Sequence, residues 1–209
     1  MTHRNKLLLF FPIWALLLLP QWSYADSPLT STPFHQAYDG VKMVEYAREH
    51  PTLDKKIAKF LMKESAALHH KAAVINAMGW NSQGKDNAEL LLDHLVKKRK
   101  IGNDEKDFEK LTAHDLFCMG YCMAMDNYFD VEDAASVLAL ASSKMPNNFT
   151  ARFIHALVMA QIAFDVDWCD VWKLVSEVEQ DGSLKRSMKP TAINIVMEYI
   201  SLYRESCNK

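Results

Sequence analysis

Four side chains with soft ligand atoms follow one another along a single predicted helix: His114, Cys118, Cys122 and Met125. The histidine and the two cysteines are spaced four residues apart, and each step of four advances a helix by about 400°, so the three share one face. Met125 falls within the same arc. An imidazole, two thiolates and a thioether suit Cu(I), and suit Zn²⁺ less well. The spacing therefore permits a copper or zinc site.

The same helix face also has the composition of a buried stripe. Phe117 and Tyr121 border it. In a protein core, cysteine behaves as a small apolar side chain and methionine fills gaps. Packing is therefore the interpretation we favour for this face, with no cofactor expected, and metal binding is the alternative hypothesis.

The four cysteines outside the N-terminal segment leave the disulfide pairing open. Cys118 and Cys122 are one helical turn apart, which separates their Cβ atoms by about 5–6 Å. A disulfide requires about 3.5–4.5 Å between Cβ atoms. Bridges between helices that involve Cys169 or Cys207 are therefore better candidates, and the sequence does not choose among them.

Trp168 and Trp172 are also four residues apart and share a helix face. Such side chains either fill the seam between packed helices or line a groove that holds a partner, where tryptophan is a frequent hot-spot residue. Filling the seam is the plainer interpretation. The pair is nevertheless our candidate for binding a protein or peptide partner.

Motifs of the common enzyme classes are missing from the sequence. It contains no Gly-x-Ser-x-Gly elbow, no glycine-rich phosphate loop and no His-Glu-x-x-His zinc helix. Six glycines in the whole chain leave little material for active-site loops. We therefore predict a protein without catalytic activity.

The N-terminal residues have the features of an export signal. Arg4 and Lys6 precede an apolar run from Leu7 to Leu19, and Ser23-Tyr24-Ala25 has the small-x-small pattern that signal peptidase recognises. The run is shorter than the ~20 residues that span a bilayer. We predict that residues 1–25 are a cleaved signal peptide, that the mature chain has no membrane span, and that it is exported to the periplasm or out of the cell.

Net charge argues against polyanionic partners. Removal of residues 1–25 moves the formal charge from −2 to −4, because two basic and no acidic side chains are lost. A mildly acidic protein is poorly suited to nucleic acid or to an anionic membrane surface. We therefore expect no nucleic-acid partner.

Residues 36–207 predict a single α-helical domain, preceded by a disordered leader over residues 26–35 that is rich in serine, threonine and proline. Apolar residues recur at spacings of three and four almost to the end, and no alternating run bounded by tight turns predicts a strand. The predicted helices cover residues 36–49, 68–78, 86–98, 112–125, 131–143, 150–164, 167–179 and 190–205, with a further one after Thr52. Helices joined by short turns lie antiparallel, so we expect an all-α fold of hairpins, stacked as a short superhelix or packed as an irregular bundle.

Within residues 115–148, two small residues and a proline stand at characteristic positions: Ala134, Ala141 and Pro146. This stretch resembles a single tetratricopeptide repeat, a helix–turn–helix unit of about 34 residues. The family's first-helix aromatic and glycine are Cys118 and Cys122 here. The resemblance implies a helical-repeat scaffold that holds a protein partner.

Two functional hypotheses follow from these patterns. The first is an exported, non-catalytic, helical-repeat-like module that binds a protein or peptide partner through Trp168 and Trp172. The alternative is a periplasmic or extracellular protein that binds copper or zinc through the His-x3-Cys-x3-Cys face of residues 114–122.

Overall fold

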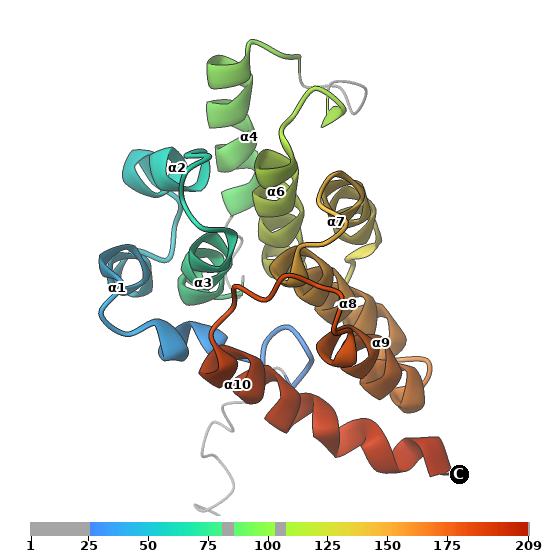
Figure 1. The fold of residues 1–209 in the computed structure, drawn as a ribbon. Helices are drawn as coiled ribbons and strands as arrows, with labels where there is room; N and C mark the ends of the chain where they lie inside the picture. Colours follow the sequence, from blue (N-terminus) through green and yellow to red (C-terminus); the bar gives the residue numbers. More distant parts are fainter. Residues whose placement is uncertain (1–25, 81–85, 103–107, 209) are drawn as a thin grey trace, which may run out of the picture.

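The computed structural model describes residues 26–80, 86–102 and 108–208, and over these ranges the chain is built from helices (Figure 1). The predicted all-α fold class is confirmed. No strand occurs in the described ranges, where the only β-type pairing is an isolated parallel bridge between Asn148 and Lys185. None of the helices in these ranges combines the length and the apolar composition needed to cross a bilayer. The predicted signal peptide, residues 1–25, lies outside the described residues.

Most helices pack against a helix that lies close to them in the chain. In chain order the elements, with η for 3-10 helices, are η2 (Phe34–Tyr38), α1 (Lys42–Glu49), α2 (Lys55–Leu61), α3 (Leu68–Met78), α4 (Asn87–Arg99), α6 (Ala113–Asp126), α7 (Glu132–Lys144), α8 (Phe149–Ala163), α9 (Trp168–Gln180), α10 (Pro190–Ile200) and η3 (Ser201–Asn208). Consecutive helices from α6 to α9 pack against one another, and α3 packs on α6. Because α10 returns to contact η2, the first and last parts of the fold lie together (Figure 1).

Side-chain caps fix where several helices begin. At α6, the Thr112 hydroxyl accepts from the Asp115 amide and the Asp115 carboxylate accepts from the Thr112 amide, which forms a capping box. Asn148 caps α8 and Asp167 caps α9, each accepting a hydrogen bond from an amide of the first turn. These amides have no partner within the helix, so each cap stabilises the helix start.

The first predicted helix, residues 36–49, is two elements in the structure. Gly40 has φ of 84° and separates η2 from α1. Glycine adopts this backbone region without the strain that a Cβ would cause, so it ends one element and redirects the chain. The last predicted helix, residues 190–205, is likewise divided, because α10 ends at Ile200 and continues as η3.

The prediction of a disordered leader over residues 26–35 is wrong for the structure described here. Leu29 is 1% exposed, and its amide donates a hydrogen bond to Oε1 of Gln161 at 3.3 Å. Thr32 is fully buried, and its hydroxyl donates to the carbonyl oxygen of Pro28 at 2.7 Å. Serine, threonine and proline gave the segment a disordered composition, but the buried side chains of Leu29 and Phe34 and hydrogen bonds to Gln161 and Asn76 attach it to the domain.

The hairpin of α6 and α7 is tightest at Gly120. A Cβ built on Gly120 would lie 2.8 Å from Cγ of Leu138 and 3.1 Å from the carbonyl oxygen of Ala134. Ala134 and Ala141, the predicted small residues of the second helix, are buried on α7. The hairpin therefore requires small residues on both of its helices. Its resemblance to a tetratricopeptide repeat stays a prediction, since any close helix pair makes the same demand.

We expect Gly120→Ala to lower the free energy of unfolding by about 1–3 kcal/mol, because the added methyl group must push α6 and α7 apart. The loss should appear although alanine favours a helix over glycine by about 1 kcal/mol. Urea unfolding followed by circular dichroism measures it. Gly182→Ala is the matched control, because no atom lies within 4 Å of its Cβ position. Equal unfolding midpoints for both variants would contradict the close contact.

Candidate functional site

His114, Cys118, Cys122 and Met125 lie together on α6, but most of this face belongs to the core. Cys118 and Cys122 are each 1% exposed, and Met125 is also buried. Burial raises the pKa of the Cys118 thiol to about 12 and raises the pKa of Cys122 well above its ordinary value. Both cysteines are free of disulfides. A thiol in these surroundings stays protonated at neutral pH and is a poor nucleophile.

The four predicted metal ligands share a helix face without sharing a coordination point. The Cys118 thiol donates to the carbonyl oxygen of Leu61 at 3.8 Å, and His114 directs Nδ1 toward Lys71. Over the described ranges, no group of three or more His, Cys, Asp or Glu side chains is arranged to hold a metal ion. This geometry gives the copper and zinc hypothesis no support, and the burial agrees with the packing interpretation.

A buried lysine lies behind His114. Lys71, on α3, is fully buried, and its Nζ is 3.1 Å from Nδ1 of His114. Burial lowers the pKa of Lys71, and the negative charges of Asp115 and Glu64 oppose that effect. Burial, followed by the charge of Lys71, lowers the pKa of His114. The histidine is thereby kept neutral beside a cation.

Asp115 links this pair to the rest of the fold. Its side chain is 0% exposed, and Oδ2 accepts from Nε of Arg99 at 2.8 Å and from the Thr112 amide at 3.2 Å. Among the residues that the structure describes, Oδ1 of Asp115 has no hydrogen-bond partner. Arg99 also pairs with Glu64 at 2.9 Å, between Nη2 and Oε1. We call Glu64, Lys71, Arg99, His114 and Asp115 the charge cluster; it connects α3, α4, α6 and the turn after α2.

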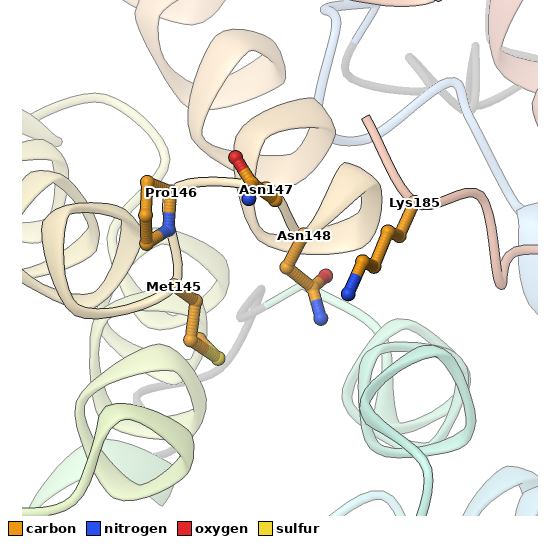
Figure 2. A pocket seen from close by; sticks show the side chains of 5 residues that line it. All are labelled: Met145, Pro146, Asn147, Asn148 and Lys185. Carbon is orange, nitrogen blue, oxygen red and sulfur yellow. The ribbon is translucent and has the colours of Figure 1, made fainter. Parts of the chain in front are cut away.

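Two adjoining hollows open next to the charge cluster. The first has a volume of about 300 Å³ and is lined by Glu64, Thr112, Ala113, His114 and Met145. The second has a volume of about 230 Å³ and is lined by Met145, Pro146, Asn147, Asn148 and Lys185. Figure 2 shows that Met145, Asn148 and Lys185 direct their side chains toward a common space between the helices. Met145 lines both hollows; His114 lines the first of them and Lys185 the second.

Two further histidines, His69 and His70, lie next to Tyr38. Nδ1 of His69 is 3.2 Å from the Tyr38 hydroxyl, and the rings of His69 and His70 are 4.3 Å apart. The Lys189 amide donates to the Tyr38 hydroxyl at 3.2 Å, and the Lys189 ammonium lies 5.1 Å from the centre of the Tyr38 ring. Burial, with the charges of His70 and Lys189, lowers the pKa of His69 to about 4. This histidine cluster joins η2, α3 and the start of α10.

A disulfide joins Cys169 and Cys207. It is a bridge between elements of the kind favoured by the sequence, and it attaches η3 to the first turn of α9. The C-terminal segment is thereby held against α9.

Exposed apolar side chains occur on the two segments that this disulfide joins. Val166, Trp168 and Leu202 are 84%, 55% and 69% exposed, and we call them the Trp168 patch. The Trp168 ring contacts the ring of Tyr203 edge-on, with centroids 6.1 Å apart, and its Nε1 donates to the carbonyl oxygen of Phe164 at 2.9 Å. The indole is therefore held in one orientation while one side of it faces solvent.

The two predicted partner-binding tryptophans differ in their surroundings. Trp172 is half-buried against the core, and the guanidinium of Arg204 lies 5.5 Å from its ring centre. Trp172 thus fills the seam between helices, while Trp168 remains at the surface. The seam-filling interpretation fits Trp172, and binding of a partner by Trp168 stays a prediction.

Lys71 and Asp115 were not predicted as site residues, although each has a signal in the sequence. Lys71 directly precedes the apolar run of residues 72–75, and Asp115 stands three residues after Thr112, the spacing of a capping box. Neither signal identifies the residues that Lys71 and Asp115 contact across the fold.

The chain matches none of the protein-family models, curated proteins or solved structures with which it was compared.

Proposed function

We propose that this chain is an exported, non-catalytic, helical interaction domain that binds a protein partner through the Trp168 patch. The observation that carries the proposal is the exposure of Val166, Trp168 and Leu202 on the two segments that a disulfide joins. Large exposed apolar side chains that lie together mark interaction surfaces more often than isolated ones do. Tryptophan is among the residues that contribute most when an interface buries them.

The rigidity of the patch favours binding. Trp168 is held by its hydrogen bond to the Phe164 carbonyl and by its contact with Tyr203, and the Cys169–Cys207 bond restrains both elements of the patch. Ordering a mobile side chain at an interface opposes association by about 0.5–1.5 kcal/mol. An anchor that is already fixed avoids most of that loss.

The charges around the patch indicate the chemistry of the partner. Residues 165–173 contain three aspartates, all exposed, and a single lysine, Lys173, which pairs with Asp170 at 3.7 Å. On η3, Arg204 and Glu205 balance each other. The rim is therefore acidic around an apolar centre. We infer a partner segment with apolar side chains flanked by lysine or arginine.

Export is part of the proposal and has two supports. Residues 1–25 have the pattern of a signal peptide. The Cys169–Cys207 disulfide suits an oxidising compartment such as the periplasm or the extracellular space. Both point to a partner that is itself exported.

A crosslinking experiment tests the patch. A photoreactive amino acid in place of Val166 should capture a partner segment in cells that export the chain, and the same residue in place of Phe129 should not. Phe129 is the matched control because it is 85% exposed and lies on the turn between α6 and α7.

A peptide copied from the captured segment should then bind the wild-type chain, more weakly as salt is added. We expect Trp168→Ala to weaken this binding by about tenfold or more, as a hot-spot residue does. Phe129→Ala should leave the affinity unchanged. Equal affinities for wild type and Trp168→Ala would refute the proposal, as would a second copy of this chain as the sole captured molecule.

A further inference from the structure

His114 stands between a buried cation and open space. Its Nδ1 faces Lys71 at 3.1 Å, and its ring is part of the wall of the 300 Å³ hollow. Within the described part of the chain, the contact of Nδ1 with Lys71 is the hydrogen bond that the His114 side chain makes. Lys71 itself is fully buried and is not among the residues that line the hollow.

The lysine determines which nitrogen of His114 carries the proton. An ammonium group has three donors and no acceptor, so Nδ1 must accept from it. The neutral ring then carries its hydrogen on Nε2, since the contact made by one nitrogen sets the state of the other. His114 is thereby fixed as a hydrogen-bond donor, and the charge behind it strengthens that donor.

Charges around the hollow leave a cationic excess. Lys71, Lys98 and Arg99 supply three positive charges, and Asp115 and Glu64 supply two negative ones. The carboxylate of Glu64 borders the hollow but is bound by Arg99. Lys185 adds a further cation in the adjoining hollow (Figure 2).

We propose that the hollow at His114 binds a small oxyanion, the carboxylate or phosphate group of a metabolite-sized molecule. Nε2–H of His114 donates to an oxygen of the anion, and Lys71 is a positioning residue that fixes the imidazole from behind. A second anionic group on the same molecule would reach the adjoining hollow with Lys185. This site is separate from the Trp168 patch and does not depend on it.

Calorimetric titration of the mature chain with succinate and with inorganic phosphate, at constant ionic strength, tests the site. We expect saturable binding of at least one of them in the millimolar range or tighter, and whichever binds identifies the favoured group. Lys71→Met and His114→Gln should each weaken binding by about tenfold or more. Lys173→Met is the matched control, because it removes the same charge from an exposed residue on α9 and should change nothing.

Nitrogen NMR of the histidine rings gives a readout that a purely structural role for Lys71 would not move. In the wild type, His114 should carry its proton on Nε2, and in Lys71→Met it should become a mixture of both tautomers. If Lys71→Met fails to fold, His114→Gln and the wild-type tautomer still decide the matter. Absence of saturable binding by both anions, affinities unchanged in His114→Gln, or a wild-type proton on Nδ1 would each overturn the proposal.

Discussion

Asp115→Ala is expected to lower the free energy of unfolding by about 3 kcal/mol, the scale on which a broken buried ion pair destabilises a protein. The substitution removes the partner of Nε of Arg99 and the acceptor for the Thr112 amide at the start of α6. It also removes a carboxylate whose charge favours the buried ammonium of Lys71. Helices α3, α4 and α6 would therefore lose the side chain through which all three interact. Urea unfolding of the variant and the wild type gives the difference directly.

Two further variants separate the contributions. Asp115→Asn keeps an oxygen that accepts from the Thr112 amide but loses the charge, so it should fall between alanine and wild type. Glu64→Ala removes the second carboxylate that pairs with Arg99. The Glu64 side chain is 62% exposed, so this change should alter stability by less than about 1 kcal/mol. If Asp115→Ala were as mild as Glu64→Ala, the cluster would not hold α3, α4 and α6 together.

The helices themselves were largely predictable, because their signals are local. The apolar period, Thr112 at the start of α6 and Gly79 after α3 are readable within a few residues, and both ends of α3 were predicted correctly. Failures occurred where a local signal was weak or overridden. Gly40 divides the first predicted helix, and Leu29 attaches a segment whose composition suggested disorder.

The candidate site was only half predictable, for a physical reason. Spacing along α6 placed His114, Cys118 and Cys122 on one helix, as the structure has them, but spacing says nothing of what another helix brings to that face. Lys71 is 43 residues away in the chain and meets His114 only because α3 packs on α6. The same limit applies to Trp168 and Trp172, which share a helix face but are covered differently by η3 and the core.

Acid is expected to destabilise the protein between pH 6.5 and about 4, in the range where its half-buried histidines resist protonation. Burial lowers the pKa of five histidines in the folded chain: His35, His69, His70, His114 and His155. Each has a pKa near 6.5 when unfolded, so between the two values the unfolded chain binds more protons than the folded one. The contribution of these histidines to stability is therefore complete above pH 6.5 and is lost as the pH is lowered.

His69 should contribute most to this loss, since its pKa is lowered to about 4. Allowing for partial solvent screening of a group that is only half-buried, the contribution is about 1–2 kcal/mol at pH 4. Unfolding free energies measured at intervals from pH 7 to pH 4 should show the decline, and His69→Gln should make it shallower.

Lys189→Gln tests the cause of the effect, because it removes one of the charges that lower the pKa of His69. In this variant the pKa of His69, followed by NMR titration, should rise toward 6.5, and the acid-induced loss of stability should shrink with it. The Tyr38 hydroxyl would keep its hydrogen bond from the backbone amide of residue 189, which the substitution leaves in place. If the unfolding free energy of the wild type stayed constant from pH 7 to pH 4, protonation of these histidines would not destabilise the fold. That result would contradict the lowered pKa of His69 in its packing against Tyr38.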